Sequence, residues 1–126
     1  MKVYKFGGAS VRNADGVRNL SRIVEGEENL FIIVSAMGKT TNALERVFSC
    51  MQTSRKEEAN AEIRQIQAYH AEIINDLWGE PTEINEVTLL FGQLRNIIND
   101  ITYRQSDAEL WYDTIVAFGE LISTAI

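Results

Sequence analysis

A lysine and two glycines stand near the start of the chain, directly after a short run of strand-forming residues. The stretch reads Lys5-Phe6-Gly7-Gly8-Ala9-Ser10 and follows Val3 and Tyr4. The strand-forming residues are followed by glycines, which permit positive φ angles and let a ligand approach main-chain N–H groups, so we expect a turn between a strand and a helix. The amides of such a turn, the helix N-terminus and the Lys5 ammonium all attract an anion. The stretch therefore indicates a phosphate-binding turn, although a glycine pair after a strand can also be purely structural.

A second strand is predicted one helix further along the chain. Apolar residues at helical spacing predict a helix from Asn13 to about Glu25. The run Leu30–Val34 is continuously apolar, which is typical of a strand covered on both faces in a parallel sheet. A right-handed βαβ connection would bring Gly7-Gly8 and Ser35-Ala36 to the same sheet edge. Open α/β sheets bind their ligands at this edge.

The rest of the chain is predicted to be helical. Stripes of apolar side chains at helical spacing mark four segments, at residues 44–51, 63–77, 87–103 and 108–122. Gly79 and Pro81 separate the second of these helices from the third, as a C-terminal glycine and a helix-opening proline. The last helix is apolar around most of its circumference, so we expect it to be mostly buried. Two strands are too few for an independent sheet, and we expect the N-terminal piece of a longer protein.

Composition excludes several classes of function. The chain has 126 residues, enough for one domain, and a net charge of −6 without a basic stripe, which argues against nucleic acid as a partner. The N-terminus has no apolar segment of the length of a signal peptide or membrane span, so we expect a cytoplasmic protein without a membrane partner. With one cysteine (Cys50) and one histidine (His70), a bound metal is not expected; both side chains are predicted to be buried and unreactive.

A polar loop follows the second strand. Its Gly38-Lys39-Thr40 resembles the end of a P-loop, but that motif requires another glycine five positions earlier, where this chain has Ile33. Thr40 and Thr41 can cap the next helix through their side-chain oxygens. At this sheet edge the same helix start would also present hydroxyls and free amides to an anion, and the two roles are compatible.

A glycine and a glutamate interrupt the last apolar helix. Gly119 costs about 1 kcal/mol relative to alanine in a helix interior, so a ligand or a neighbouring helix should approach the backbone there. Glu120 shares a helix face with Asp113 and Thr124, and this face can be simply solvent-exposed. If the face is buried instead, the carboxylate requires a cationic partner such as a substrate ammonium group.

In order and spacing, three motifs resemble those of the aspartate kinases within the amino-acid kinase family. They are Lys5–Val11, Val34-Ser35-Ala36 with Thr41-Asn42, and Gly119-Glu120-Leu121. The family usually has threonine where this chain has Ala9, which removes one hydroxyl near the phosphates. The resemblance implies an α/β fold, the N-terminal part of a three-layer α/β/α sandwich with parallel strands, helix-rich in this region. Residues 1–126 would be the N-terminal portion of the catalytic domain, without its C-terminal half and the regulatory ACT modules.

The resemblance also implies a reaction and the residues that carry it. The γ-phosphoryl group of ATP, bound with Mg²⁺, would pass to the side-chain carboxylate of L-aspartate, giving 4-phospho-L-aspartate in the first step of lysine, threonine and methionine biosynthesis. The implied site residues are Lys5 for catalysis and phosphate binding, Gly7, Gly8 and Ser10 for phosphate binding, and Ser35, Thr41 and Glu120 for substrate binding. We expect the full-length parent to be a homo-oligomer and this piece alone to be inactive.

Two alternatives stay open. The chain can belong to a sibling kinase that acts on glutamate, acetylglutamate or a nucleotide and shares the glycine-turn phosphate site. It can also be a non-catalytic helical interaction module in which the glycine turn is structural.

Overall fold

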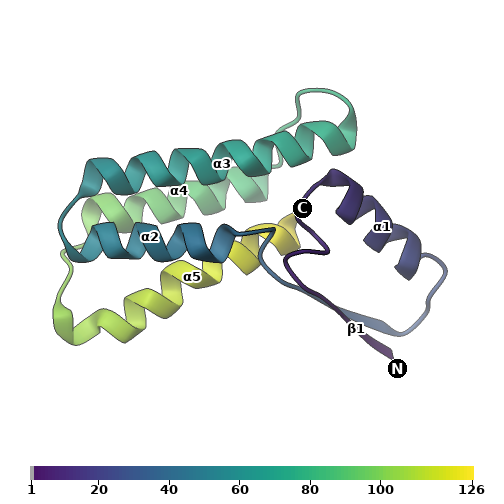
Figure 1. Cartoon of the computed structure of the whole chain (residues 1–126), viewed down its shortest axis with the longest axis horizontal. Coiled ribbons are helices and arrows are strands. Elements are labelled where there is room, and N and C mark those ends of the chain that lie inside the picture. Colours follow the sequence, from purple (N-terminus) through teal and green to yellow (C-terminus); the bar gives the residue numbers. More distant parts are fainter. Residues whose placement is uncertain (1) are drawn as a thin grey trace.

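A computed structural model describes residues 2–126, which form a two-stranded sheet beside a group of helices (Figure 1). In chain order the elements are β1 (Lys2–Phe6), α1 (Ala14–Val24), β2 (Leu30–Val34), α2 (Thr40–Gln52), α3 (Lys56–Trp78), α4 (Asn85–Asp100), the 3₁₀ turn η1 (Gln105–Asp107) and α5 (Ala108–Ala125). The predicted βαβ start and helical remainder are confirmed. None of the described helices combines the length and the hydropathy that a membrane span requires.

The two strands pair in parallel, with Lys5 opposite Ile33 and Phe6 opposite Val34. The pairing extends one step beyond the strands, because the Ser35 amide donates a hydrogen bond of 2.9 Å to the Phe6 carbonyl. Both strands therefore end at the same edge of the sheet, as the sequence predicts.

The described helices cover one face of this sheet in part and leave the other face open. Phe6 is buried in a small apolar cluster with Val11, from the turn before α1, and Ile73 of α3. On β2, by contrast, Phe31 is 56% exposed on the opposite face, and Ile32, on the same face as Phe6, is as exposed as Ile33, each at 42%. The prediction that this strand is covered on both faces is wrong for residues 2–126, because the packed helices lie on the side of Phe6.

Helices α2 to α5 form a bundle to one side of the sheet (Figure 1). Helices α2 and α4 each pack against both α3 and α5, so the four enclose one apolar core. Its most deeply buried side chains come from all four helices and follow the predicted stripes: Leu44, Val47, Ile63, Phe91, Leu94, Ile98, Ile115 and Ile122. This core fixes α2 and α5, which both reach the loop that follows β2.

The last helix is less buried than its composition predicts. Ile115 and Ile122 of α5 are fully buried, but Leu121 is 51% exposed and Leu110 is 62% exposed. Helix α5 packs mainly on α2 and α4 and also contacts β2 and η1, but no element within the described residues covers the side of Leu110 and Leu121. The prediction of a mostly buried helix is therefore wrong for this part of the protein.

The break between α3 and α4 is as predicted only in part. Gly79 ends α3 in the left-handed conformation, with φ of 73°, which is the expected C-terminal geometry. Pro81 does not open the next helix, because α4 begins four residues later at Asn85. At its other end α4 stops at Asp100, earlier than predicted, and Tyr103 instead packs edge-on against Phe48.

Candidate functional site

The turn after β1 and the loop after β2 are in direct contact. The Gly8 carbonyl accepts a hydrogen bond of 3.1 Å from the Gly38 amide. A Cβ atom at Gly8 would lie 2.8 Å from the Gly38 carbonyl oxygen and 3.1 Å from that of Ala36, so only glycine allows this approach. Gly7 and Gly8 do not adopt the positive φ that glycine permits, whereas Gly38 does, with φ of 55°. Close backbone packing, rather than turn geometry, explains the glycine at position 8.

The glycine turn presents unbonded amides. Within residues 2–126 the N–H groups of Gly7, Gly8 and Ala9 donate no hydrogen bond, whereas the Ser10 amide donates to the Gly7 carbonyl over 3.0 Å. At the N-terminus of α1, the Asn13 side chain caps the helix by accepting a hydrogen bond of 2.9 Å from the Gly16 amide. Adjacent unbonded amides attract oxyanions, so these donors of the turn are free to bind a phosphate group.

The Lys5 side chain lies on the exposed face of β1. Side chains alternate along a strand, so Lys5 points away from the buried Phe6 and lies beside its partner Ile33. It is exposed, and among the described residues its ammonium makes no hydrogen bond or ion pair. The ammonium therefore neither enters the apolar interior nor is neutralised by a neighbouring carboxylate of residues 2–126.

The start of α2 supplies further donors beside the glycine turn. The Thr40 hydroxyl is buried and donates to the Met37 carbonyl over 2.6 Å, so the prediction that it caps the helix as an acceptor is wrong. The amides of Thr41 and Asn42 donate no hydrogen bond to the loop before them. Ser35 and Thr41 are both half-buried and flank the loop after β2. The middle of this loop, at Gly38, contacts the glycine turn.

Glu120 reaches the same region from α5. Its neighbour Gly119 packs against Ala36 of the loop and against Thr40 and Leu44 of α2. The close approach predicted at this glycine is thus made by the protein itself. Glu120 is exposed and borders an apolar groove of about 660 Å³ beside β2, and within residues 2–126 it has no cationic partner. This exposure agrees with the solvent-facing interpretation, and the ammonium-binding role stays a prediction.

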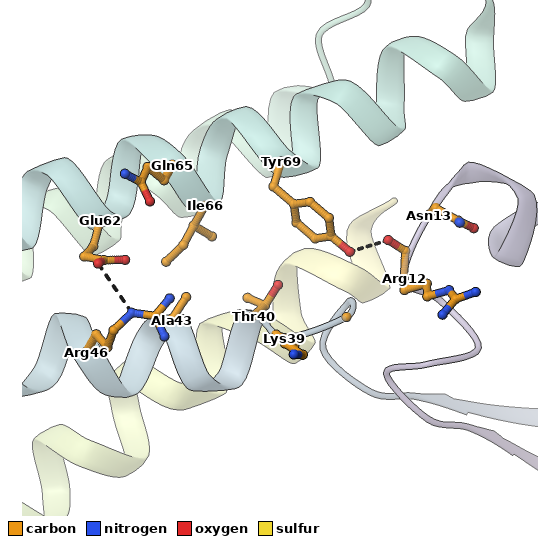
Figure 2. Close-up of a pocket in the computed structure, with 11 residues that line it drawn as sticks. Arg12, Asn13, Lys39, Thr40, Ala43, Arg46, Glu62, Gln65, Ile66 and Tyr69 are labelled. Atoms are coloured by element: carbon orange, nitrogen blue, oxygen red, sulfur yellow. Dashed lines mark hydrogen bonds and ion pairs between the residues drawn. The ribbon is translucent and has the colours of Figure 1, made fainter.

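A separate groove of about 490 Å³ lies between α2 and α3 and is bordered at one end by Lys39 of the loop after β2 (Figure 2). The Arg46 guanidinium and the Glu62 carboxylate form an ion pair of 3.4 Å across it. Thr40 of the helix start lines this groove, but none of the site residues that the resemblance implies does. No cluster of three His, Cys, Asp or Glu side chains that could hold a metal ion occurs in residues 2–126.

Tyr69 at one end of this groove is a residue that sequence reasoning missed. Figure 2 shows its side chain reaching from α3 toward the carbonyl of Arg12, to which the hydroxyl donates a hydrogen bond. Burial raises the pKa of the Tyr69 phenol above its ordinary value, and the Arg12 guanidinium acts in the opposite direction. The hydroxyl therefore remains a donor at neutral pH. No sequence signal marks this contact, because its acceptor is a main-chain carbonyl.

Comparison with known proteins agrees with this arrangement. A model of the amino acid kinase family matches residues 1–126. Among relatives, the chain is 32% identical to aspartokinase 1, chloroplastic, of Arabidopsis thaliana, over 98% of this chain and 22% of that protein. It is 31% identical to aspartokinase 2, chloroplastic, of the same plant, over 98% of this chain and 23% of that protein. The chain thus spans less than a quarter of these relatives, whose names place them in the chloroplast, and the cytoplasmic location stays a prediction.

The structure of Clostridium acetobutylicum aspartate kinase superimposes with a TM-score of 0.61 and 19% identity, covering 96% of this chain and 29% of that one. This likeness confirms the predicted fold, a helix-rich part of an α/β architecture with parallel strands. The family match includes the glycine turn, the loop after β2 and Gly119-Glu120. The chain belongs to the amino acid kinase family.

Proposed function

We propose that this chain is the N-terminal part of the catalytic domain of an aspartate kinase. The reaction would transfer the γ-phosphoryl group of ATP to the side-chain carboxylate of L-aspartate, giving 4-phospho-L-aspartate and opening the biosynthesis of lysine, threonine and methionine. The observation that carries the proposal is the contact between Gly8 and Gly38 at the ends of two parallel strands. That contact holds the glycine turn, with its unbonded amides, against the loop that leads into α2. The relatives named aspartokinases favour aspartate as the acceptor.

Phosphoryl transfer needs positioning and charge stabilisation more than covalent help from the protein. In the proposed mechanism a carboxylate oxygen of aspartate forms a bond to the γ-phosphorus while the bond to the bridging oxygen breaks, and ADP leaves with that electron pair. The amides of Gly7, Gly8 and Ala9, with Ser10 beside them, hold the phosphate oxygens. The Lys5 ammonium stabilises the negative charge on the transferring group. Magnesium would accompany the nucleotide and neutralise part of its charge.

The acceptor would lie on the other side of the transferring group. Ser35 and Thr41 offer hydroxyls, and the start of α2 offers amides, to the carboxylates of the amino acid. Glu120, exposed and without a cation from residues 2–126, would bind the ammonium group. A free α-amino group on the acceptor is the feature that such a carboxylate selects.

The test uses the protein that contains this chain at its natural length. Purified protein is incubated with ATP, Mg²⁺ and one acceptor at a time, with hydroxylamine present to convert an acyl phosphate into a stable hydroxamate. We expect hydroxamate with L-aspartate and little or none with L-glutamate or N-acetyl-L-glutamate. Turnover only with one of the latter, or ADP release only with a nucleotide, would identify a sibling kinase. A protein that binds neither ATP nor any acceptor would be the non-catalytic module.

A further inference from the structure

One phenol group in α3 contacts both loops that form the proposed phosphate site. The Tyr69 hydroxyl donates a hydrogen bond to the carbonyl of Arg12, at the end of the turn after β1 (Figure 2). The same oxygen lies close to the Cα of Gly38, in the loop after β2, because a Cβ atom built there would be only 2.5 Å from it. Tyr69 therefore bridges two segments that are 26 residues apart along the chain.

The absence of a side chain at Gly38 leaves the space that this phenol occupies. Its φ of 55° is a conformation that side-chain-bearing residues rarely adopt, and the space that a side chain would need is filled by the Tyr69 hydroxyl. From the same residue, the amide donates the 3.1 Å hydrogen bond to the Gly8 carbonyl. Movement of Gly38 would thus change the position of Gly8, and with it the unbonded amides of the glycine turn.

Tyr69 is itself held by a rigid element. On α3 it is flanked by two buried residues, Ile66 of the bundle core and Ile73 of the cluster around Phe6, and its ring contacts the buried His70 edge-on. A donor fixed on a packed helix can define the position of a loop better than one carried by another loop.

We propose that Tyr69 is a positioning residue that holds the turn after β1 against the loop after β2, so that the amides of Gly7, Gly8 and Ala9 are ordered before phosphate binds. This inference rests on the proposed function, since it assigns the two loops to a nucleotide. Tyr69 acts through Arg12 and Gly38 and does not touch the substrate.

The test is the Tyr69→Phe variant of the full-length protein, which removes only the hydroxyl. The first readout is hydrogen exchange at the Gly38 amide, whose bond to Gly8 reports directly on the contact between the loops. We expect this exchange to accelerate by roughly 3- to 10-fold, the scale of one lost hydrogen bond, while amides in the middle of α4 are unchanged.

The second readout is the KM for ATP. A site that is ordered for only part of the time binds with an apparent affinity reduced by that fraction, so we expect KM to rise by roughly 3- to 10-fold. A merely structural loss of folded molecules would lower the apparent kcat and leave KM unchanged. Tyr112→Phe is the matched control, because it removes a hydroxyl bonded to Glu45 over 3.0 Å on the surface between α2 and α5. It should change neither readout.

A double substitution tests the contact itself. Gly38→Ala places a methyl group 2.5 Å from the Tyr69 hydroxyl, but 3.4 Å from the nearest ring carbon that remains in Tyr69→Phe. The increase in KM caused by Gly38→Ala should therefore be smaller in the Tyr69→Phe background than in the wild type.

The outcomes separate this inference from the proposed function. An unchanged Gly38 exchange rate in Tyr69→Phe would overturn the inference, as would faster exchange with an unaltered KM for ATP. Neither result contradicts ATP binding by the wild-type protein, so both would leave the kinase proposal standing. A wild-type protein that binds no ATP would overturn both.

Discussion

Gly119 of α5 lies directly against Ala36 of the loop after β2. A Cβ atom built at Gly119 would be 2.8 Å from the Ala36 Cβ and 3.2 Å from the Leu44 Cδ1, well inside the distance of about 3.5 to 4.0 Å at which carbon atoms pack. Only glycine therefore lets α5 reach the edge of the sheet. The contact also determines where the next residue, Glu120, stands relative to Ser35.

We therefore expect Gly119→Ala to destabilise the protein. Overpacking of this kind costs about 1–3 kcal/mol, against a gain of about 1 kcal/mol from the better helix propensity of alanine. The net free energy of unfolding, measured by urea denaturation, should fall. Gly92→Ala is the matched control, because a Cβ at this position of α4 would meet no neighbouring atom within 4 Å. It should raise the free energy of unfolding by about 1 kcal/mol. A similar change in both variants would contradict the packing argument.

How far the sequence predicts the fold depends on the range of the interactions involved. The apolar run Leu30–Val34 and the glycine turn predict the parallel βαβ unit, because both signals are local and periodic. How deeply each face is buried cannot be predicted from local sequence, because it depends on which elements lie above and below the sheet. The exposed Phe31 and Leu121 contradict the predicted burial for this reason.

In the candidate site, too, the local features were predictable and the contacts between distant segments were not. The sequence predicts that Gly7-Gly8 and Ser35 share a sheet edge, and this is confirmed by the hydrogen bonds between the loops. It also predicts close backbone approach at Gly119, but it does not indicate whether a ligand or the protein makes that approach. The Tyr69 contact was not predictable, because every residue carries a main-chain carbonyl and spacing does not mark the one at Arg12.

Lys5→Ala in the full-length protein should lower kcat for phosphoryl transfer by at least ~10², the scale of removing one preorganised charge-stabilising group. The reason is that the Lys5 ammonium is the charge placed nearest to the glycine turn on the open face of β1. Steady-state rates of hydroxamate formation give the measurement. Lys2→Ala is the control, since Lys2 lies on the same strand and is paired with Glu27 at 3.2 Å. A rate near that of wild type in Lys5→Ala would show that Lys5 is structural.

Glu120→Gln should raise the KM for the amino-acid acceptor and leave the KM for ATP unchanged. The substitution keeps the shape of the side chain but removes the charge that would bind an ammonium group, a loss of about 1.5–3 kcal/mol or roughly 10- to 150-fold. Asp113→Asn is the matched control, because Asp113 is an exposed carboxylate on the same helix, seven residues earlier. Equal effects of the two substitutions would indicate a general effect of charge and would exclude a specific role for Glu120.

His70 is a fully buried histidine with one unsatisfied nitrogen. Its Nδ1 lies 2.8 Å from the Ile66 carbonyl oxygen, so the neutral ring donates from Nδ1 and leaves Nε2 as the acceptor. Within the described residues Nε2 has no hydrogen-bond partner, and the ring packs edge-on against Phe91. Burial lowers the pKa of His70 below its ordinary value of 6.5, although the bond to Ile66 acts in the opposite direction.

This lowered pKa predicts that the protein loses stability on mild acidification. Below about pH 6.5 the unfolded chain binds a proton at His70 while the folded chain does not, so the free energy of unfolding falls, by at most about 1.4 kcal/mol per pH unit. Above about pH 7 both states are neutral at this residue and the dependence disappears. The measurement is urea denaturation between roughly pH 5.5 and 7.5, above the range in which ordinary carboxylates titrate. His70 is the single histidine of residues 1–126, so His70→Leu should remove the contribution of this segment to the pH dependence in this window. Parallel curves for the variant and the wild type would show that the ring is protonated as easily in the folded state as in the unfolded one.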